Sequence, residues 1–515
     1  MKKIIFTQEW MAMHPYNKVE DTDLYYTNLA NKIYHALDTT CFVHQFKDTQ
    51  DAKLLALCIT SYFEDVISGT CIWKAFSTEC MKRYGTYIPF YLSDAAINNS
   101  RSLMKNAEIL PYDQDFINLA DIKFLLWHHY QQSCLVQETV PPIFGPLEIA
   151  AVMIYNLLDA EYETAPENER LYEWLCTSPT DADSFYEYRN KLEWFHYGCY
   201  FNCGNQRRLF MTLQWLANTG NYNELNAYTA RVEQTMNSRD NLLALSSAEW
   251  LAKVSEMHPE HKLWTDVDFK STRFYIVKKA DENFIYAKDT TDDSTVKVNK
   301  LSLNEEAITV ADKKDSVFSA TMFKYGDSWW LNGAMRGFEN NKETKKLIRE
   351  GKELFNHKVA IDDYNLLKEN GFGARFVFAD NMSDVREFLK QIGYDKELPQ
   401  MPSHNNEIII YGSPYTGLNI TTGIAHCICS PDNPFYNQER AAEHCFDIIS
   451  GNGHPFPYEI VCMLIAGGML PDANAFASKY VKDFGSIITQ ENLQFFADYY
   501  LKGRRDKDLS PQELW

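Results

Sequence analysis

The spacing of apolar residues changes once along the chain, near His261, and this change constrains the fold more than any other feature. Before it, apolar residues recur every three or four positions, as on one face of a helix. After it, over about 75 residues, they fall in short alternating runs separated by turn-forming clusters such as Gly326-Asp327. The sequence therefore predicts a helical region followed by a small β-rich module.

The region 1–260 is predicted to be helical. Its clearest helix covers residues 51–68 and ends at Gly69, and a second one covers residues 71–84. Asn118 fits the N-cap position of a third helix. Further helices are expected at 118–132, 147–158, 184–202, 205–218, 222–237 and 246–257, and an acidic, proline-containing break near 159–183 allows two sub-bundles.

The segment 261–338 is predicted to be a small β-barrel of the SH3-like or OB-like kind, because five or six short strands fit into it. Trp329 and Trp330 follow one another in its last strand, so one should fill the barrel core and the other should face outward. The outward ring is expected to be covered by a neighbouring domain or to belong to a partner site. Asn332-Gly333 is expected to form the turn that leaves the barrel. The strand residues are taken to include Phe274, Ile276, Phe284, Ile285, Tyr286, Val296, Val298, Ile308, Val310, Val317, Phe318, Met322 and Phe323.

Residues 339–515 alternate between strand and helix patterns and are predicted to form an α+β domain. The fold class expected for the whole chain is therefore α+β, mostly α, with domains at 1–260, 261–338 and 339–515. The elements expected in the last domain are a charged helix at 339–354, strands at 375–379 and 407–411, a hairpin around 417–429, and helices at 383–392, 437–449, 457–465 and 489–502.

The charge and the cysteines restrict the partners and the compartment. A net charge of −20 repels phosphate backbones and anionic lipids, so we expect neither nucleic acid nor a membrane as a partner. The apolar run after Lys2 and Lys3 stops at Thr7, too early for a signal peptide. Most of the twelve cysteines lie in apolar helical runs, as free buried thiols do. We expect a cytoplasmic protein without a cofactor.

No complete catalytic or nucleotide-binding motif occurs in the sequence: GxxxxGK[ST], GxGxxG, GxSxG and HExxH are all missing. On helix 51–68, Asp65 lies at the margin of the apolar face, whereas Glu64 points away from it and is expected to face solvent. His129 lies on the apolar face of its own helix. If the two helices pack together, Asp65 would hold His129 in one tautomer, either as a core contact or as a catalytic acid–base pair.

A second cluster offers five soft ligands within twenty residues: His426, Cys427, Cys429, His444 and Cys445. If 424–429 is a strand, Cys427 and Cys429 face one side of it and His426 faces the other. The spacing matches no zinc motif, so we expect no bound metal. If a metal ion is bound, these five residues are the candidate ligands.

The chain contains several distinctive stretches rich in aromatic residues, Gly and Pro: 62–69 with Trp73 and Phe76, 84–91, 117–121 with Phe124, Leu125, Trp127 and His128, 329–333, 431–436 and 470–473. Together they resemble a family of uncharacterised gut-bacterial (Bacteroidetes-type) proteins that is defined only as a domain of unknown function. The resemblance runs over most of the chain, and its motifs are typical of structural positions. The family has no assigned activity, so the resemblance implies no catalytic residue.

These observations favour a non-enzymatic, intracellular interaction or scaffold protein with a protein partner, for which Trp329 and Trp330 are the candidate binding residues. The alternative is a soluble enzyme of the hydrolase type, with its site in a cleft between the helical and C-terminal domains and with Asp65 and His129 as candidate catalytic residues. A deep pocket with convergent titratable groups would favour the enzyme, and a broad exposed apolar patch would favour the binding protein.

Overall fold

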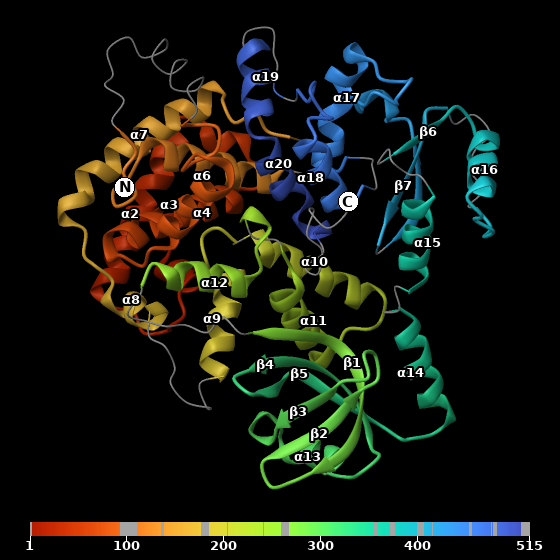
Figure 1. Cartoon of the computed structure of the whole chain (residues 1–515). Coiled ribbons are helices and arrows are strands. Elements are labelled where there is room, and N and C mark those ends of the chain that lie inside the picture. The colour runs from red at the N-terminus through yellow and green to blue at the C-terminus, as the bar shows by residue number, and fades with distance from the viewer. Residues whose placement is uncertain are drawn as a thin grey trace. The chain divides into compact units, whose positions relative to one another are not determined.

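The chain folds as an α+β protein in which helices predominate, as the computed structural model shows (Figure 1). Contacts between residues divide it into two compact units, 1–349 and 350–515. The finer division into three domains stays a prediction. The structure describes residues 3–92, 111–134, 139–176, 185–202, 204–239, 242–258, 267–354, 358–370, 376–398, 406–414, 416–452, 456–474, 476 and 482–505.

The helices of the first unit lie close to the predicted ranges. Helix α3 (Thr49–Ser68) begins at Asp48, whose side chain accepts a hydrogen bond from the backbone N–H of Gln50, and it ends at Gly69 with φ +62°. The predicted N-cap, Asn118, precedes α6 (Leu119–Ser133). The other helices are α1 (Thr7–Met11), α2 (Asp21–Thr39), α4 (Ile72–Tyr84), α7 (Gly145–Glu161), α8 (Glu169–Cys176), α9 (Phe185–Tyr197), α10 (Gly204–Asn218), α11 (Glu224–Asn237) and α12 (Ser247–Glu256).

The predicted break near 159–183 contains the end of α7, a short 3-10 turn (Tyr162–Thr164) and α8. Residues 177–183 of this break lie outside the described residues.

Five strands of the first unit close into a barrel in the order β1-β2-β3-β5-β4. Neighbouring strands are antiparallel except β3 and β5, which run parallel with Val298 opposite Trp329. A helix, α13 (Glu305–Ala311), lies between β3 and β4 in the chain. This order is that of the five-stranded OB-type Greek-key barrel. The strands are β1 (Asp268–Ala280), β2 (Phe284–Asp289), β3 (Thr295–Asn299), β4 (Val317–Tyr325) and β5 (Ser328–Phe338).

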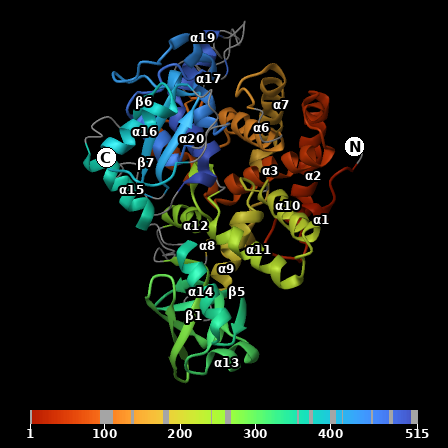
Figure 2. The same ribbon diagram turned by 90° about the vertical axis from the view of Figure 1, so that its right-hand side faces the viewer.

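The two adjacent tryptophans divide between the two faces of β5, as predicted. Trp329 is half-buried and packs against the barrel core, which contains Tyr275 and Phe318. Trp330 faces outward but is only 1% exposed, because it stacks on Phe185 of α9 with ring centroids 4.8 Å apart. Helices α9 and α11 thus cover the β4–β5 side of the barrel (Figure 2).

The predicted strand around Ile308 and Val310 is wrong, because these residues belong to α13. The Asn304 side chain accepts a hydrogen bond from the backbone N–H of Ala307 at the start of this helix. Two glutamates in the first turn add a favourable interaction with the helix dipole. Local capping therefore outweighs the alternating pattern.

The predicted turn at Asn332-Gly333 is also wrong, because β5 continues through it to Phe338. Gly333 has φ +106°, a conformation in which a side chain would be strained. It lies against Val232 of α11, where an added Cβ would be 3.5 Å from a methyl group. The glycine serves close packing in the middle of a strand rather than a chain reversal.

The second unit contains a three-stranded antiparallel sheet in the order β6-β7-β8. The predicted strand at 424–429 is wrong: β8 ends at Thr422 and a 3-10 turn, η6 (Ala425–Cys427), follows. Residue 375 of the strand predicted at 375–379 lies outside the described residues. The strands are β6 (Val377–Ala379), β7 (Ile408–Ser413) and β8 (Gly417–Thr422), and the helices are α15 (Lys358–Glu369), α16 (Met382–Gln391), α17 (Gln438–Ser450), α18 (Tyr458–Ala466), α19 (Lys482–Glu491) and α20 (Leu493–Leu501), with α14 (Lys342–Leu354) at the boundary between the units.

Within the described part of the chain, no helix taken alone has the length and apolar character needed to cross a membrane. Helices α3 and α4 meet that criterion only as a pair, and the pair bends by 92°.

Candidate functional site

Two of the residues predicted as a Cys/His cluster, His426 and His444, meet in a hydrogen-bonded array in the second unit. His426 lies in η6, and its Nδ1 is 3.1 Å from Oε2 of Glu407. On its other side, Nε2 of His426 is 3.1 Å from Nδ1 of His444, which comes from α17. Arg440, one turn earlier on α17, binds both carboxylate oxygens of Glu407. Glu407 and Arg440 were not among the predicted site residues.

The direction of each hydrogen bond follows from the groups involved. A carboxylate only accepts, so Nδ1 of His426 carries its hydrogen and donates it to Glu407. Burial lowers the pKa of His426, so the ring is neutral and its Nε2 accepts a hydrogen bond from His444. Burial alone would raise the pKa of Glu407, but the hydrogen bonds from Arg440 and His426 lower it. His444, the outer member of the array, is exposed.

Glu407 adopts a backbone conformation that is unusual for a residue with a side chain. Its φ is +58°, in the left-handed region, directly before β7 begins. Such a conformation costs on the order of 1–3 kcal/mol and persists only where the surroundings enforce it. Here the carboxylate is held by Arg440 and His426 together.

The thiols of this cluster lie in different surroundings. Cys427 and Cys445 are both buried, and Sγ of Cys445 is 3.7 Å from the carbonyl oxygen of Cys427. Hydrogen bonding to Cys427 and burial raise the pKa of Cys445, so it remains a thiol. Cys429 is exposed. Across the described ranges, no group of three or more His, Cys, Asp or Glu side chains is arranged to hold a metal ion.

Asp65 and His129 are joined through Tyr200 rather than directly. Asp65 accepts hydrogen bonds from the first two backbone N–H groups of α4 at 3.0 and 2.7 Å, and from the Tyr200 hydroxyl at 2.7 Å. Nε2 of His129 is 3.2 Å from the carbonyl oxygen of the same tyrosine. Burial raises the pKa of Asp65 and lowers that of His129 to about 4. Among the described residues, the two side chains form no hydrogen bond with each other.

Glu64 is buried at 1% exposure, so the prediction that it faces solvent is wrong. Its Oε2 is 2.9 Å from Nε2 of His14, and its Oε1 accepts a hydrogen bond of 2.7 Å from Asn168. Burial alone would lower the pKa of His14, but the charge of Glu64, the hydrogen bond to it and the hydrogen bond to the Trp10 backbone together raise the pKa. The segment before α2 and the residues leading into α8 therefore cover the second face of α3. The apolar pattern of α3 indicates one buried face and does not predict this second covering.

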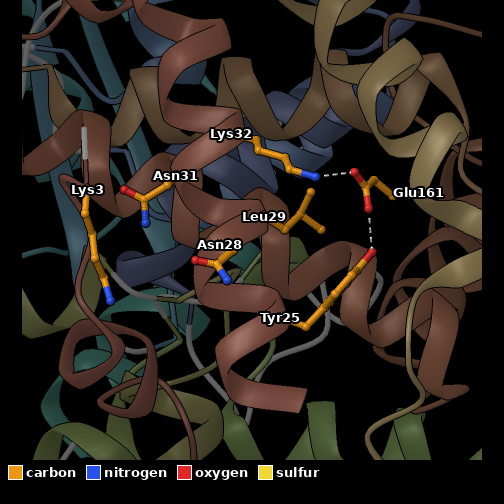
Figure 3. A pocket seen from close by; sticks show the side chains of 7 residues that line it. All are labelled: Lys3, Tyr25, Asn28, Leu29, Asn31, Lys32 and Glu161. Carbon is orange, nitrogen blue, oxygen red and sulfur yellow. Dashed lines mark hydrogen bonds and ion pairs between the residues drawn. The ribbon is translucent and has the colours of Figure 1, made fainter. Parts of the chain in front are cut away.

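A pocket of about 450 Å³ lies beside α2 and the end of α7 (Figure 3). Glu161 forms an ion pair with Lys32 and accepts a hydrogen bond of 2.9 Å from Tyr25. Asn31 uses its amide oxygen to bind the backbone N–H groups of Ile4 and Ile5. Glu161, Lys32 and Tyr25 are thus engaged with one another, whereas Asn31 is engaged with the backbone. The pocket is lined by Lys3, Tyr25, Asn28, Leu29, Asn31, Lys32 and Glu161.

Large apolar side chains are exposed on the hairpin formed by α10 and α11. On α10, Phe210, Met211 and Trp215 are 58, 60 and 60% exposed. Sequence analysis predicted this helix but not the surface, because apolar residues occupy both of its faces and the pattern does not say which face is covered. The surface, called the α10–α11 surface below, consists of Arg207, Arg208, Phe210, Met211, Trp215, Tyr222, Leu225 and Tyr228, all exposed.

Of the two predicted binding residues, Trp330 is buried between the barrel and α9 and offers no open surface. Trp329 is half-buried, and the ammonium group of Lys270 lies 5.4 Å from its ring centroid.

Comparison with known proteins identifies a family but no activity. The model of the family described as "Protein of unknown function (DUF3843)" matches residues 4–288 and 340–502. No curated protein and no solved structure matches the chain. The family match confirms the resemblance to a domain of unknown function, and it leaves out residues 289–339, which contain β3, β4 and β5. The chain belongs to the DUF3843 family of proteins of unknown function.

Proposed function

We propose that the protein is a non-enzymatic interaction protein that binds another protein through its α10–α11 surface. One observation carries the proposal: Phe210, Met211 and Trp215 lie within two turns of one helix and are each exposed by more than half. Covering apolar surface is favourable by roughly 25 cal/mol per Å². Adjacent exposed apolar side chains with polar neighbours are typical of interaction sites.

The charges beside these residues indicate what kind of partner fits. Arg207 and Arg208 are exposed in the first turn of α10, next to the apolar side chains. Trp and Arg are the residue types that most often dominate the binding energy of an interface. We therefore propose a partner that presents an apolar surface with acidic residues at its edge.

Site-specific photo-crosslinking in the native cell tests this proposal. A benzophenone amino acid at Met211 should form an adduct with one protein, which mass spectrometry identifies and which binds the purified full chain. The same amino acid at Ile149 of α7, which is 62% exposed, is the matched control. The adduct should disappear when Phe210→Ser and Trp215→Ser are combined. An adduct at 211 no stronger than that at 149 would refute the proposal.

An enzyme of the hydrolase type is the second candidate, and the Glu407–His426–His444 array is the observation that favours it. A carboxylate that orients an imidazole is a recurring way to prepare a general base. Chromogenic ester, amide and phosphoester substrates should be turned over by the wild type and not by His444→Gln. Equal rates for the two proteins would remove this candidate. A site in a cleft between the helical and C-terminal domains stays a prediction.

We also propose that the protein works in the cytoplasm of a bacterial cell. Free thiols include four buried cysteines: Cys176, Cys427, Cys445 and Cys462. Buried free thiols suit a reducing compartment. A fusion of the full chain to a cytoplasm-dependent reporter, compared with fractionation of the native protein, tests this assignment.

A further inference from the structure

The net charge of −20 is not spread evenly over the chain. Residues 267–338, which contain the barrel, carry eleven basic and eleven acidic side chains, so this part is neutral while the remainder is strongly acidic. Three of the basic residues, Lys279, Lys288 and Lys297, lie on the outer face of β1, β2 and β3. This face, called the β1–β3 face below, presents Ile276, Lys279, Phe284, Tyr286, Lys288, Thr295 and Lys297.

The strand register aligns these side chains in rows. Lys279 of β1 is opposite Tyr286 of β2, which is opposite Lys297 of β3. The alternate positions, such as Ile285 and Val296, point into the barrel core. The β1–β3 face therefore has a tyrosine ring flanked by two ammonium groups. None of its seven residues is acidic, and the carboxylate of Asp281 lies beside them, next to Tyr286 and Lys279.

The aromatic rings on this face can be approached from outside. The ammonium group of Lys279 lies 4.3 Å from the ring centroid of Tyr286, and that of Lys297 lies 4.0 Å from the ring centroid of Phe284. Both rings are half-buried, and a long, flexible side chain lies over each of them. Phe284 and Tyr286 are two residues apart on one strand, so their rings repeat about every 7 Å along it.

The helices of the first unit pack on the other side of the barrel. Helix α9 covers Trp330 on β5, and Glu233 of α11 accepts a hydrogen bond of 2.6 Å from Thr321 on β4. The principal contacts of β2 and β3 are instead with neighbouring strands. Figure 1 shows both strands below β4 and β5, farther from α9 and α11.

Two exposed ion pairs at the rim neutralise part of the positive charge. Lys288 is 2.8 Å from Asp293, and Lys297 is 3.0 Å from Asp327. The two carboxylates are 56 and 84% exposed, so water and salt screen both pairs and a ligand anion can replace them.

We propose that the β1–β3 face binds single-stranded nucleic acid, with bases stacked on Phe284 and Tyr286 and with phosphates bound by Lys279, Lys288 and Lys297. Aromatic rings alternating with ammonium groups fit a ligand that has flat rings and a repeated negative charge. In a duplex the faces of the bases are stacked on one another and cannot stack on the two rings. A neutral oligosaccharide carries no negative charge for the lysine ammonium groups to bind. Repulsion from the acidic remainder of the chain acts weakly beyond about 10 Å at 0.1 M salt. The whole-chain charge that argued against nucleic acid is therefore compatible with this local site.

Fluorescence anisotropy of the full chain with labelled oligothymidylate of about twelve nucleotides tests the proposal at about 50 mM salt. We expect saturable binding that weakens with salt, and weaker binding of a duplex of the same length. Phe284→Ala with Tyr286→Ala should weaken binding by about tenfold or more. Lys279→Ala with Lys297→Ala should also reduce its salt dependence.

Two further variants separate this site from other causes of binding or its loss. Asp293→Asn with Asp327→Asn should tighten binding, and a gain of affinity cannot result from misfolding. Trp215→Ala on the α10–α11 surface should leave the affinity unchanged, which separates this site from the proposed protein partner. Absence of binding at about 50 µM protein would overturn the proposal. Binding that is equally strong for heparin and insensitive to the aromatic substitutions would also overturn it, because any polyanion would then suffice.

Discussion

Buried ionisable residues in the first unit stabilise helix starts and join helices to one another. Asp65 accepts hydrogen bonds at the start of α4, and Asp121 near the start of α6 accepts one of 2.6 Å from Tyr62. Burial raises the pKa of Asp121 to about 6. Each carboxylate contacts donors from other parts of the unit. Replacing one of these buried residues should therefore mainly lower the free energy of unfolding.

The buried pair His14–Glu64 leads to the first prediction. His14→Leu should lower the free energy of unfolding by about 3–5 kcal/mol, because it leaves the Glu64 carboxylate buried without its charged partner. His14→Leu combined with Glu64→Leu should cost less than the sum of the two single changes, because no unpaired charge remains. Urea denaturation of the four proteins measures the coupling. Additive costs would show that the pair does not interact.

The lowered pKa of His129 predicts a loss of stability in mild acid. Its folded-state pKa of about 4 lies below the unfolded value of 6.5, so the unfolded chain binds the proton first as the pH falls. Stability from this group is present above pH 6.5 and is lost toward pH 4. At about pH 5 the loss should reach about 2 kcal/mol.

The variant His129→Gln isolates this effect from other titrating groups, because it keeps a donor for the Tyr200 carbonyl but cannot be protonated. Its deficit in unfolding free energy relative to wild type should shrink by about 2 kcal/mol between about pH 7.5 and pH 5. A deficit that stays constant over this range would contradict the assignment.

At the scale of elements, the contact between α9 and β5 holds the barrel to the helices. Trp330→Ala should lower the free energy of unfolding by about 3–5 kcal/mol, because it empties a fully buried site beside Phe185. Trp329→Ala should cost less, about 1–3 kcal/mol, because that ring is half-buried. A larger cost for Trp329→Ala than for Trp330→Ala would contradict this order. Denaturant unfolding of both variants decides between the two orders.

Helix positions could be predicted from the sequence because their signals are local. Residues 51–68 repeat apolar side chains and end at Gly69, and α3 follows this range closely. The predictions are wrong where a segment distant in sequence determines the conformation or the exposure of a residue. Gly333 looks like a turn residue until Val232 of α11 is seen beside it, and Glu64 looks exposed until His14 is seen to cover it.

The candidate site was only half predictable for the same reason. His426 and His444 stand out as soft ligands close together in sequence. Glu407, nineteen residues before His426, is an ordinary acidic residue in sequence, and only the fold brings it to the ring. The α10–α11 surface could not be predicted, because exposure depends on which neighbours cover a helix and the helical period does not contain that information.

At the scale of the whole molecule, the two units should unfold separately. Ten of the eleven tryptophans lie in residues 1–349, and the remaining one is Trp515. Tryptophan fluorescence therefore follows mainly the first unit, whereas far-ultraviolet circular dichroism follows the helices of both. We expect the thermal transitions seen by the two methods to differ. Trp330→Ala should shift the fluorescence transition and the part of the circular-dichroism curve that comes from the first unit, while the remaining part stays in place. Coincident curves for the wild type would show one cooperative unit.

The barrel closes through β3 and β5, which share a single residue pair, Val298 with Trp329. Every other pair of neighbouring strands shares five or more. A cylinder with one short junction opens there first when it fluctuates, so amide hydrogens of β3 and β5 at this seam should exchange with solvent sooner than those between β4 and β5. Because β3 also carries Lys297, a nucleic-acid strand bound across the β1–β3 face would contact β1, β2 and β3 together. Its binding should therefore slow the local opening between β3 and β5.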